Sequence, residues 1–363
     1  MARVVIIGLI LLGEFGVLEA GLRVFGTMES QPAFQSLFMP DARIGIRLRP
    51  GVSVRYATSE FSNDLTINRQ GVRDYDDIGP KGPDERRVLI LGDSYVFAVQ
   101  VPLSDTFGEQ LEVRLNESDP AHRWRVINGG VQGYGPVEEW LFYRHVASKF
   151  DPDIVLIMVS VGNDAIEAFD AKAKLELGRV PEETQLQRSR LQLRQIVRSS
   201  LVLQLVHLRA NQLQARTFAG TFERPLVAYL EHPPSFFFDG MQVAEGAFGH
   251  MTAQARNDGA KVALVLMPAR FQIRDEEYQR QSSTAERAGG KLLRNAATER
   301  FATALARLDE PTLDLLPIFS SLEDPEALYF VGNSHLTARG HRVVAEALQD
   351  FLSRNRLTAT TAR

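Results

Sequence analysis

Short apolar runs that alternate with stretches of helical periodicity constrain the fold of this chain more than any other feature. Val, Ile and Leu dominate these runs without polar alternation, which is typical of parallel strands buried on both faces of a sheet. The runs are residues 88–91, 124–127, 154–161, 262–267 and 313–318. Five strands with helices between them predict a three-layer α/β/α sandwich around a five-stranded parallel sheet.

Helical periodicity is found in the stretches between and after the apolar runs. The predicted helices are residues 106–115, 137–150, 241–257, 285–308 and 338–354. In the last of them the apolar residues fall on one face, and Thr337 is a suitable N-cap just before it.

The chain divides into four predicted parts. These are an N-terminal signal anchor (1–26), a small β-rich preface (27–85), the α/β domain (86–354) and a short tail (355–363). A linker, Pro80-Lys81-Gly82-Pro83, separates the preface from the α/β domain.

Residues 165–240 fit the alternation of strands and helices poorly, and we interpret them as a helical insertion. A Gln-, Arg- and Leu-rich helix is predicted there from about 183 to 217. Three phenylalanines follow at 236–238. We interpret them as core packing, with the lining of an acyl or sugar pocket as the alternative.

The N-terminus has the pattern of a signal peptide or signal anchor, because Arg3 precedes an apolar stretch at 4–12. Glu14 and Glu19 interrupt the apolar character toward its far end, and no good small-residue cleavage site is evident. We therefore expect an uncleaved membrane anchor with the rest of the chain outside the cytoplasm, on the periplasmic side of a bacterial cell. A cleaved signal peptide and a buried amphipathic helix are the alternatives.

Composition excludes several classes of function. The chain has 363 residues, a formal net charge of −4 and no cysteine. The charge argues against a nucleic-acid partner, and the lack of cysteine excludes disulfides, thiolate metal sites and a cysteine nucleophile. The histidines have no metal-ligand spacing such as His-x-x-x-His. We therefore predict neither a metal nor an organic cofactor.

Four segments that could carry chemistry follow predicted strands or precede the last helix. They are Gly92-Asp93-Ser94, Asn128 to Gly135, Gly162-Asn163-Asp164 and Asn333-Ser334-His335. In open α/β folds, ligands bind at the carboxyl edge of the sheet, where segments that follow the strands meet. A serine at that edge is a nucleophile if a base reaches it. Helix caps or tight turns also explain each segment when it is taken alone.

In their order along the chain, these segments resemble the motifs of the SGNH (GDSL-like) hydrolase family across the predicted α/β domain. The resemblance implies an ester hydrolase in which Ser94 is the nucleophile and His335 is the general base. It also implies that the amides of Ser94 and Gly133 and the side chain of Asn163 bind the oxyanion of the tetrahedral intermediate.

Other polar residues near these segments are interpreted as structural. Asp93 and Asp164 are expected to be hydrogen-bond partners of the turns, and His341 is expected on the surface of the last helix. A flavodoxin-like nucleotide site is disfavoured, because the segment after the first strand lacks a Gly-x-Gly-x-x-Gly or Walker pattern.

One part of the chain departs from the pattern of the resembled family. That family usually places an aspartate two or three residues before the histidine, and this chain has Asn333 and Gly332 there. An amide can orient the imidazole but cannot offset the charge of the imidazolium. Three interpretations stay open: a Ser-His dyad oriented by Asn333, a substitute carboxylate such as Asp324 or Glu326, or a loss of catalysis.

The sequence therefore predicts a membrane-anchored, extracytoplasmic serine esterase, or an O-acyltransferase or deacylase, that acts through an acyl-serine intermediate. Its expected partner is a small-molecule or glycan ester, and the habits of the resembled family suggest an O-acylated glycan. The alternative is a catalytically degenerate SGNH-like binding module at the cell envelope.

Overall fold

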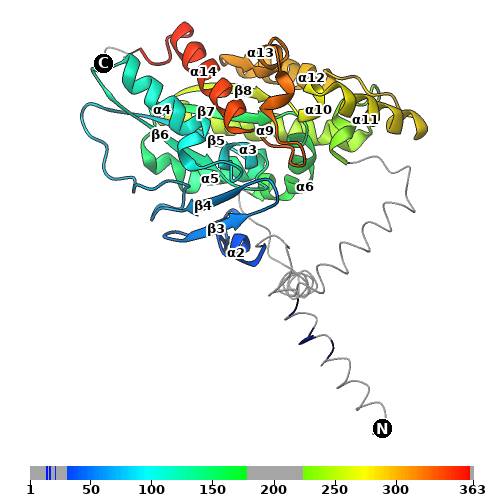
Figure 1. The fold of residues 1–363 in the computed structure, drawn as a ribbon. Coiled ribbons are helices and arrows are strands. Elements are labelled where there is room, and N and C mark those ends of the chain that lie inside the picture. Colours follow the sequence, from blue (N-terminus) through cyan, green and yellow to red (C-terminus); the bar gives the residue numbers. More distant parts are fainter. Residues whose placement is uncertain (1–13, 15, 18–20, 22–30, 178–223, 360–363) are drawn as a thin grey trace.

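A five-stranded sheet lies at the centre of the computed structural model, which describes residues 14, 16, 17, 21, 31–177 and 224–359. The strand order is β6-β5-β7-β8-β9, and every neighbouring pair is parallel (Figure 1). The strands are β5 (Glu85–Gly92), β6 (Arg123–Gly130), β7 (Ile154–Ser160), β8 (Lys261–Met267) and β9 (Thr312–Asp314). If the strands of this sheet are numbered along the chain, their spatial order is 2-1-3-4-5, which is the order of flavodoxin-like folds. The predicted five-stranded parallel sheet is confirmed.

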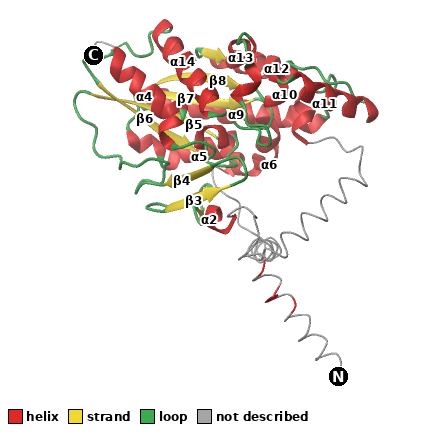
Figure 2. Cartoon of the chain, viewed as in Figure 1, coloured by secondary structure: helices red, strands yellow, loops and turns green. Residues whose placement is uncertain are grey.

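Helices lie on both sides of this sheet (Figure 2). The longer ones are α4 (Phe107–Ser118), α5 (Pro136–His145), α6 (Asp164–Leu177), α9 (Ser235–Asn257), α11 (Asp275–Arg287), α12 (Ala296–Leu305) and α14 (Ala338–Arg354). The short α-helices are α2 (Gln31–Gln35), α3 (Ser94–Phe97), α10 (Arg270–Ile273) and α13 (Leu315–Ser320). Short 3-10 helices are η1 (Leu103–Asp105), η2 (Ala147–Phe150), η3 (Arg224–Tyr229), η4 (Ala306–Leu308) and η5 (Pro325–Leu328).

The two faces of the sheet bury separate hydrophobic clusters, because successive side chains of a strand point to opposite faces. In β5, Leu89 and Leu91 belong to the cluster that also contains residues of α5, α6 and α9. Val88 and Ile90 belong to the cluster that contains residues of α4, α13 and α14. Burial on both faces explains the unbroken apolar runs of the sequence. The predicted three-layer α/β/α fold class is therefore confirmed.

The last predicted strand, 313–318, is wrong for most of its length, because β9 ends at Asp314 and α13 follows at once. Asp314 caps this helix by accepting a hydrogen bond from the amide of Leu316 at 2.9 Å. Pro317 stands in the first turn, where its missing N–H is tolerated. The apolar residues that suggested a strand are the buried face of a short helix.

The single helix predicted at 285–308 is also wrong, because two helices occupy this region. α11 ends at Arg287 and α12 begins at Ala296. Gly289, between them, has a φ of +79°, which ends a right-handed helix. α12 buries an apolar face with Phe301 and Leu305, whereas Ala285 is the one buried residue of α11.

The predicted insertion at about 165–240 overlaps two helices that cover the sheet. α6 packs against α9, and both contribute to the same hydrophobic cluster. The middle of the predicted insertion, with its helix from about 183 to 217, lies outside the described residues. Phe237 is fully buried whereas Phe238 is 53% exposed, so the phenylalanines do not share one environment.

The predicted signal anchor at 1–26 falls almost entirely on residues outside those described. Among the residues whose structure is described, no helix is long and apolar enough to cross a membrane. The anchor therefore stays a prediction.

Two antiparallel hairpins, here called the N-terminal hairpins, precede the parallel sheet in the chain (Figure 1). β1 (Phe38–Asp41) pairs with β2 (Gly45–Leu48), and β3 (Ser53–Ala57) pairs with β4 (Ser62–Thr66). Their buried residues Leu48 and Leu65 belong to the same hydrophobic cluster as Phe97 of α3. The hairpins therefore share a core with the α/β domain.

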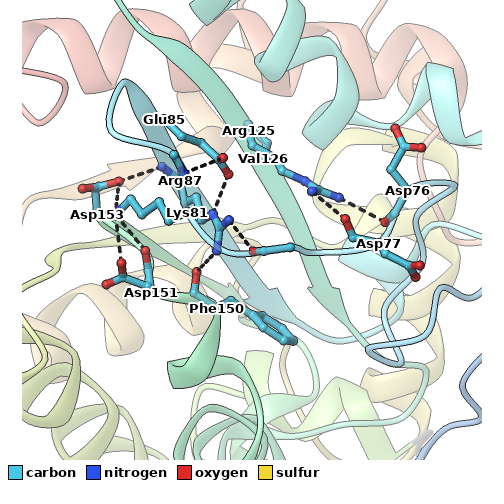
Figure 3. A network of polar contacts seen from close by, with 12 residues as sticks. Asp76, Asp77, Lys81, Glu85, Arg87, Arg125, Val126, Phe150, Asp151 and Asp153 are labelled. Atoms are coloured by element: carbon cyan, nitrogen blue, oxygen red, sulfur yellow. Dashed lines mark hydrogen bonds and ion pairs between the residues drawn. The ribbon is translucent and has the colours of Figure 1, made fainter.

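A network of charged side chains holds the predicted linker at 80–83 against the amino edge of the sheet (Figure 3). Arg87 of β5 donates to two backbone carbonyls and pairs with Glu85 at 2.6 Å. Lys81 pairs with Asp153, just before β7, at 2.8 Å. These contacts fix the chain between the hairpins and β5 at the edge opposite to the carboxyl ends of the strands.

Candidate active site

Ser94 lies at the carboxyl end of β5, where the chain turns directly into α3. A Cβ on Gly92 would come within 2.4 Å of the side chain of Val96, so this tight turn requires glycine. Asp93 caps the helix by accepting a hydrogen bond from the amide of Tyr95 at 2.8 Å. Ser94 is therefore the first residue of a short helix at the sheet edge where open α/β folds bind ligands.

His335 lies beside Ser94, although 241 positions separate the two residues in the sequence. Its Nε2 is 2.7 Å from the Oγ of Ser94, and its Nδ1 is 2.6 Å from the Oδ1 of Asn333. Because an amide oxygen only accepts hydrogen bonds, this second contact assigns the ring proton to Nδ1. Nε2 is then an acceptor for the serine hydroxyl, as a general base requires.

Burial lowers the pKa of His335 to about 4. Desolvation alone causes this shift, and the charge of no described carboxylate opposes it. A histidine with so low a pKa is neutral at pH 7, so the imidazole can accept a proton. Once formed, however, the imidazolium has no negative partner to stabilise it.

This low pKa predicts an unusual acid limit for turnover. Because the base must be neutral, kcat/KM for an uncharged ester should hold as the pH falls and decline only near pH 4. A histidine with an ordinary pKa would lose activity already near pH ~6.5. A pH–rate profile measures the limit, and circular dichroism at each pH separates protonation of His335 from unfolding. A decline centred near pH ~6.5 in folded protein contradicts the prediction.

Side chains from other elements hold the segment that carries His335, here called the histidine loop (residues 329–335). The hydroxyl of Tyr95 donates to a backbone carbonyl of the loop at 3.0 Å, and its ring centroid is 5.0 Å from that of His335. Arg270 of α10 donates to three further carbonyls of the loop, and Glu277 pairs with its guanidinium at 2.7 Å. These contacts fix the imidazole relative to the end of β5.

The proposed substitute carboxylates do not reach His335. Asp324 and Glu326 each pair with an arginine, at 3.4 Å. Asn333 occupies the position beside Nδ1 of the imidazole. The interpretation in which Asp324 or Glu326 completes a triad is therefore wrong, and a dyad oriented by an amide and a loss of catalysis remain.

The glycine-rich segment at the end of β6 closely approaches the helix that begins with Ser94. A Cβ on Gly130 would lie 2.3 Å from the amide nitrogen of Phe97, so a side chain there would prevent this approach. Gly133 is exposed and has a φ of +77°. Its amide donates no hydrogen bond within the described part of the chain, so it is available to an oxyanion.

Asn163 follows β7 and lies beside Asp93. Its Nδ2 is 3.4 Å from the Oδ2 of Asp93, and its side chain also hydrogen-bonds Glu167. The predicted oxyanion donors Ser94, Gly133 and Asn163 thus follow β5, β6 and β7, which are neighbours in the sheet. Sequence reasoning did not indicate the carboxyl groups of Asp93 and Glu167 beside Asn163.

Four carboxyl groups cluster next to Asn163, on Asp93, Glu139, Asp164 and Glu167. Burial raises the pKa of each, that of Glu167 to about 8, and repulsion among them adds to the rise for the last three. No group of acidic or histidine side chains has the arrangement of a metal site in the described ranges. The hydrogen bonds that Asp93 accepts from Tyr95, Ser160 and Asn163 oppose the rise of its own pKa.

Asp93 and Asp164 have the structural role that the sequence indicates. Ser160 at the end of β7 donates its hydroxyl to Asp93 and its amide to Asp164, each at 2.9 Å. The two carboxyl groups therefore tie the end of β7 to the turn that carries Ser94.

His341 does not lie on the helix surface, so that interpretation is wrong. Its side chain is buried, and its Nδ1 accepts a hydrogen bond from the amide of Phe107 at 3.2 Å. The face of α14 that carries His341 packs against α4, which the spacing of one helix alone does not reveal.

Sequence reasoning missed Arg73, which supports the turn after α3. The guanidinium is buried and donates to the backbone carbonyls of Phe97, Ala98 and Val101. Ala98 has a φ of 52°, an uncommon conformation for a residue with a side chain. Arg73 thus stabilises a strained turn immediately beyond the helix of Ser94.

Replacing Arg73 with Leu should lower the free energy of unfolding by about 3 kcal/mol, because three backbone carbonyls lose their donor. Urea unfolding followed by circular dichroism measures the change. Arg69→Leu is the matched control, since the Arg69 side chain is 81% exposed. A loss below about 0.5 kcal/mol for Arg73→Leu, as expected of a surface residue, contradicts the assigned role.

Comparisons with known proteins find likeness in structure only. No model of a protein family matches the chain, and no curated protein matches it. A lipase/acylhydrolase from Enterococcus faecalis is 11% identical with a TM-score of 0.43, over 76% of this chain and 100% of that one. A lipolytic protein of the G-D-S-L family from Desulfitobacterium hafniense is 12% identical with a TM-score of 0.39, over 73% and 99%. The acetyl xylan esterase AlAXEase is 13% identical with a TM-score of 0.42, over 73% and 98%.

The solved structures that match thus include a lipase/acylhydrolase, an acetyl xylan esterase and one lipolytic protein of the G-D-S-L family. At this identity and TM-score, the likeness carries no argument about the activity or substrate of this chain. Any inference about its activity or substrate must come from the side chains of its own site.

Proposed function

We propose that the chain is a serine hydrolase that cleaves carboxylic esters through an acyl-Ser94 intermediate. The observation that carries this proposal is the hydrogen-bonded line from Ser94 through His335 to Asn333, with contacts of 2.7 and 2.6 Å. A serine hydroxyl at the sheet edge, bonded to a neutral imidazole, is an activated nucleophile. The order of the GDSL-like motifs along the chain supports the same class of enzyme.

In the acylation step, the Oγ of Ser94 attacks the ester carbonyl carbon while Nε2 of His335 takes the hydroxyl proton. The carbonyl oxygen becomes an oxyanion, which the amides of Ser94 and Gly133 and the Nδ2 of Asn163 can bind. The bond to the alcohol oxygen then breaks, and His335 returns the proton to that oxygen. The alcohol leaves and the acyl group stays on Ser94.

In the second step, Nε2 of His335 takes a proton from a water molecule, whose oxygen attacks the acyl carbon. The bond between the acyl carbon and the Oγ of Ser94 then breaks, His335 returns the proton to this oxygen, and the carboxylic acid leaves. If a glycan hydroxyl takes the place of water, the same residues transfer the acyl group to it. Hydrolase and O-acyltransferase therefore differ only in the acceptor that reaches acyl-Ser94.

Turnover of p-nitrophenyl acetate tests this proposal with a small activated ester. We expect release of p-nitrophenol, and we expect acid-quenched protein to carry one acetyl group on the peptide that contains Ser94. Folded protein that neither releases p-nitrophenol nor becomes acetylated would contradict the proposed activity.

We further propose that the chain acts outside the cytoplasm, held at a membrane by its N-terminal segment, with an O-acylated glycan as substrate. The support for the location is Arg3 followed by the apolar stretch at 4–12. A C-terminal fusion to a reporter enzyme that is active only outside the cytoplasm tests the location. Release of acetate from an acetylated oligosaccharide tests the substrate class.

Asn333 favours one second candidate, a degenerate binding module that holds an acylated glycan without cleaving it. The amide leaves the imidazolium without a negative partner, which weakens the base in the transition state. Calorimetric binding of an acetylated oligosaccharide without release of acetate supports this module. Release of acetate on the time scale of binding supports the esterase.

A further inference from the structure

We propose that Glu60 of the N-terminal hairpins is a positioning residue for His335, an inference that rests on the proposed function for its kinetic consequences. Glu60 lies in the turn between β3 and β4. Its Oε1 accepts a hydrogen bond at 2.8 Å from the amide of Gly332, which belongs to the histidine loop. The two partners are 272 positions apart in the sequence.

Gly332 and Glu60 fit one another sterically. A Cβ on residue 332 would lie 2.9 Å from Oε2 and 3.2 Å from Cδ of Glu60, so a side chain there would require the carboxylate to move. The carboxylate of Glu60 therefore occupies the space in which a side chain at 332 would begin. Glu60 thus supplies a carboxylate from another element of the fold that contacts the histidine loop at Gly332.

The turn that carries Glu60 has a defined conformation of its own. The Oγ1 of Thr58 accepts from the amides of Glu60 and Phe61, at 3.1 and 3.2 Å. The amide of Thr58 in turn donates to the carbonyl of Phe61 at 2.8 Å. The ring of Phe61 lies 5.8 Å from that of Phe330 in the histidine loop. The turn therefore meets the loop through one polar and one aromatic contact.

Glu60 and Arg270 contact neighbouring residues of the same short stretch of backbone. Glu60 accepts from the amide of Gly332, and Arg270 donates to the carbonyl of Asn333 at 3.2 Å. The residue between these two contacts presents its Oδ1 to Nδ1 of His335. Without Glu60, the backbone just before Asn333 loses the contact that holds the Gly332 amide, and the imidazole loses part of its orientation.

Glu60→Ala should therefore lower kcat for p-nitrophenyl acetate about 10-fold, because misplacing a reacting group slows the chemical step. KM should change less than about 2-fold, since the ester-binding surface is not altered. Glu60→Gln retains an oxygen acceptor for the Gly332 amide and should restore kcat to within about 2-fold of wild type. Rescue by Gln, which has no charge, separates a positioning hydrogen bond from an effect of charge.

Asp64→Ala is the matched control, because Asp64 is a carboxylate of the same hairpin with a side chain that is 69% exposed and paired with Arg55. We expect this variant to have the kcat of wild type. Urea unfolding of each variant shows whether a change in kcat comes with a change in stability.

The NMR signal of the Nδ1 proton of His335 gives a second measurement that does not need turnover. We expect this signal to shift or broaden in Glu60→Ala and to stay unchanged in Glu60→Gln and Asp64→Ala. An unchanged kcat and signal in Glu60→Ala overturns the proposal, and so does a Gln variant that is as impaired as the Ala variant. If wild type has no esterase activity but Glu60→Ala alters the signal, the proposed function fails and the positioning role stands.

Discussion

Ser94→Ala should lower kcat for p-nitrophenyl acetate by about 10⁴- to 10⁶-fold, the largest effect that we expect of any substitution in this chain. The reason is that no other described hydroxyl contacts the Nε2 of His335, which lies 2.7 Å from the Oγ of Ser94. Without the nucleophile, only the oxyanion donors and substrate binding can contribute. Initial rates over a range of ester concentrations measure the loss.

Two observations complete this test. Ser104→Ala is the control, because Ser104 is exposed in the nearby η1 and has no contact with His335. It should leave kcat unchanged. The urea midpoint of Ser94→Ala should match that of wild type, because the half-buried hydroxyl makes little contribution to the core. A folded Ser94→Ala protein with more than about a tenth of the wild-type kcat would remove Ser94 from the mechanism.

Asn333→Asp should raise kcat for the same ester by about 10- to 10³-fold, because a carboxylate next to a cation shifts its pKa by about 1–3 units. Aspartate has nearly the shape of asparagine, so the contact with Nδ1 of His335 can persist. The negative charge then stabilises the imidazolium that forms as Ser94 attacks. The acid limit of kcat/KM should also move above its value near pH 4.

Gln279→Glu is the matched control for charge, because it adds one negative charge to an exposed position of α11. This variant should have the kcat of wild type. Asn333→Ala should lower kcat, since the imidazole then loses both orientation and its Nδ1 partner. A decrease in kcat for Asn333→Asp would mean that the amide itself is needed. That result would contradict the view that Asn333 limits the rate because it lacks a negative charge.

The parts of this fold that sequence predicts are those with a periodic local signal. The strand with residues 88–91 is apolar throughout because the sheet is covered on both faces, and Gly92 and Ser94 mark its carboxyl end. Parallel strands bring such ends to one edge, so the segments of Ser94 and Asn163 could be assigned to one site before their contacts were known. His335 was assigned to that site by the resemblance of the motifs to the SGNH family.

Sequence did not predict features that depend on a single local cap or on a distant partner. Asp314 caps a helix within an apolar run that otherwise resembles a strand, and it does so by accepting one hydrogen bond. Arg73 and Glu60 are ordinary charged residues in the sequence, and their roles come from contacts with Phe97 and Gly332. Such contacts join segments that are far apart in the chain, so no spacing pattern reveals them.

The buried carboxyl groups beside Asn163 were missed for a related reason. Glu139 and Glu167 lie on helices, where acidic residues are usually solvated, and nothing in their spacing indicates burial. Their environment is fixed by the packing of α5 and α6 on one face of the sheet. A single sequence contains no record of that packing.

Labelling with a fluorophosphonate probe, followed by peptide mapping, tests most directly whether the imidazole of His335 activates the hydroxyl of Ser94. We predict a covalent adduct on Ser94 in wild type, no adduct at this position in Ser94→Ala, and strongly reduced labelling in His335→Ala. A wild-type protein that is folded but carries no label on Ser94, or a His335→Ala variant that is labelled as fast as wild type, would contradict the account.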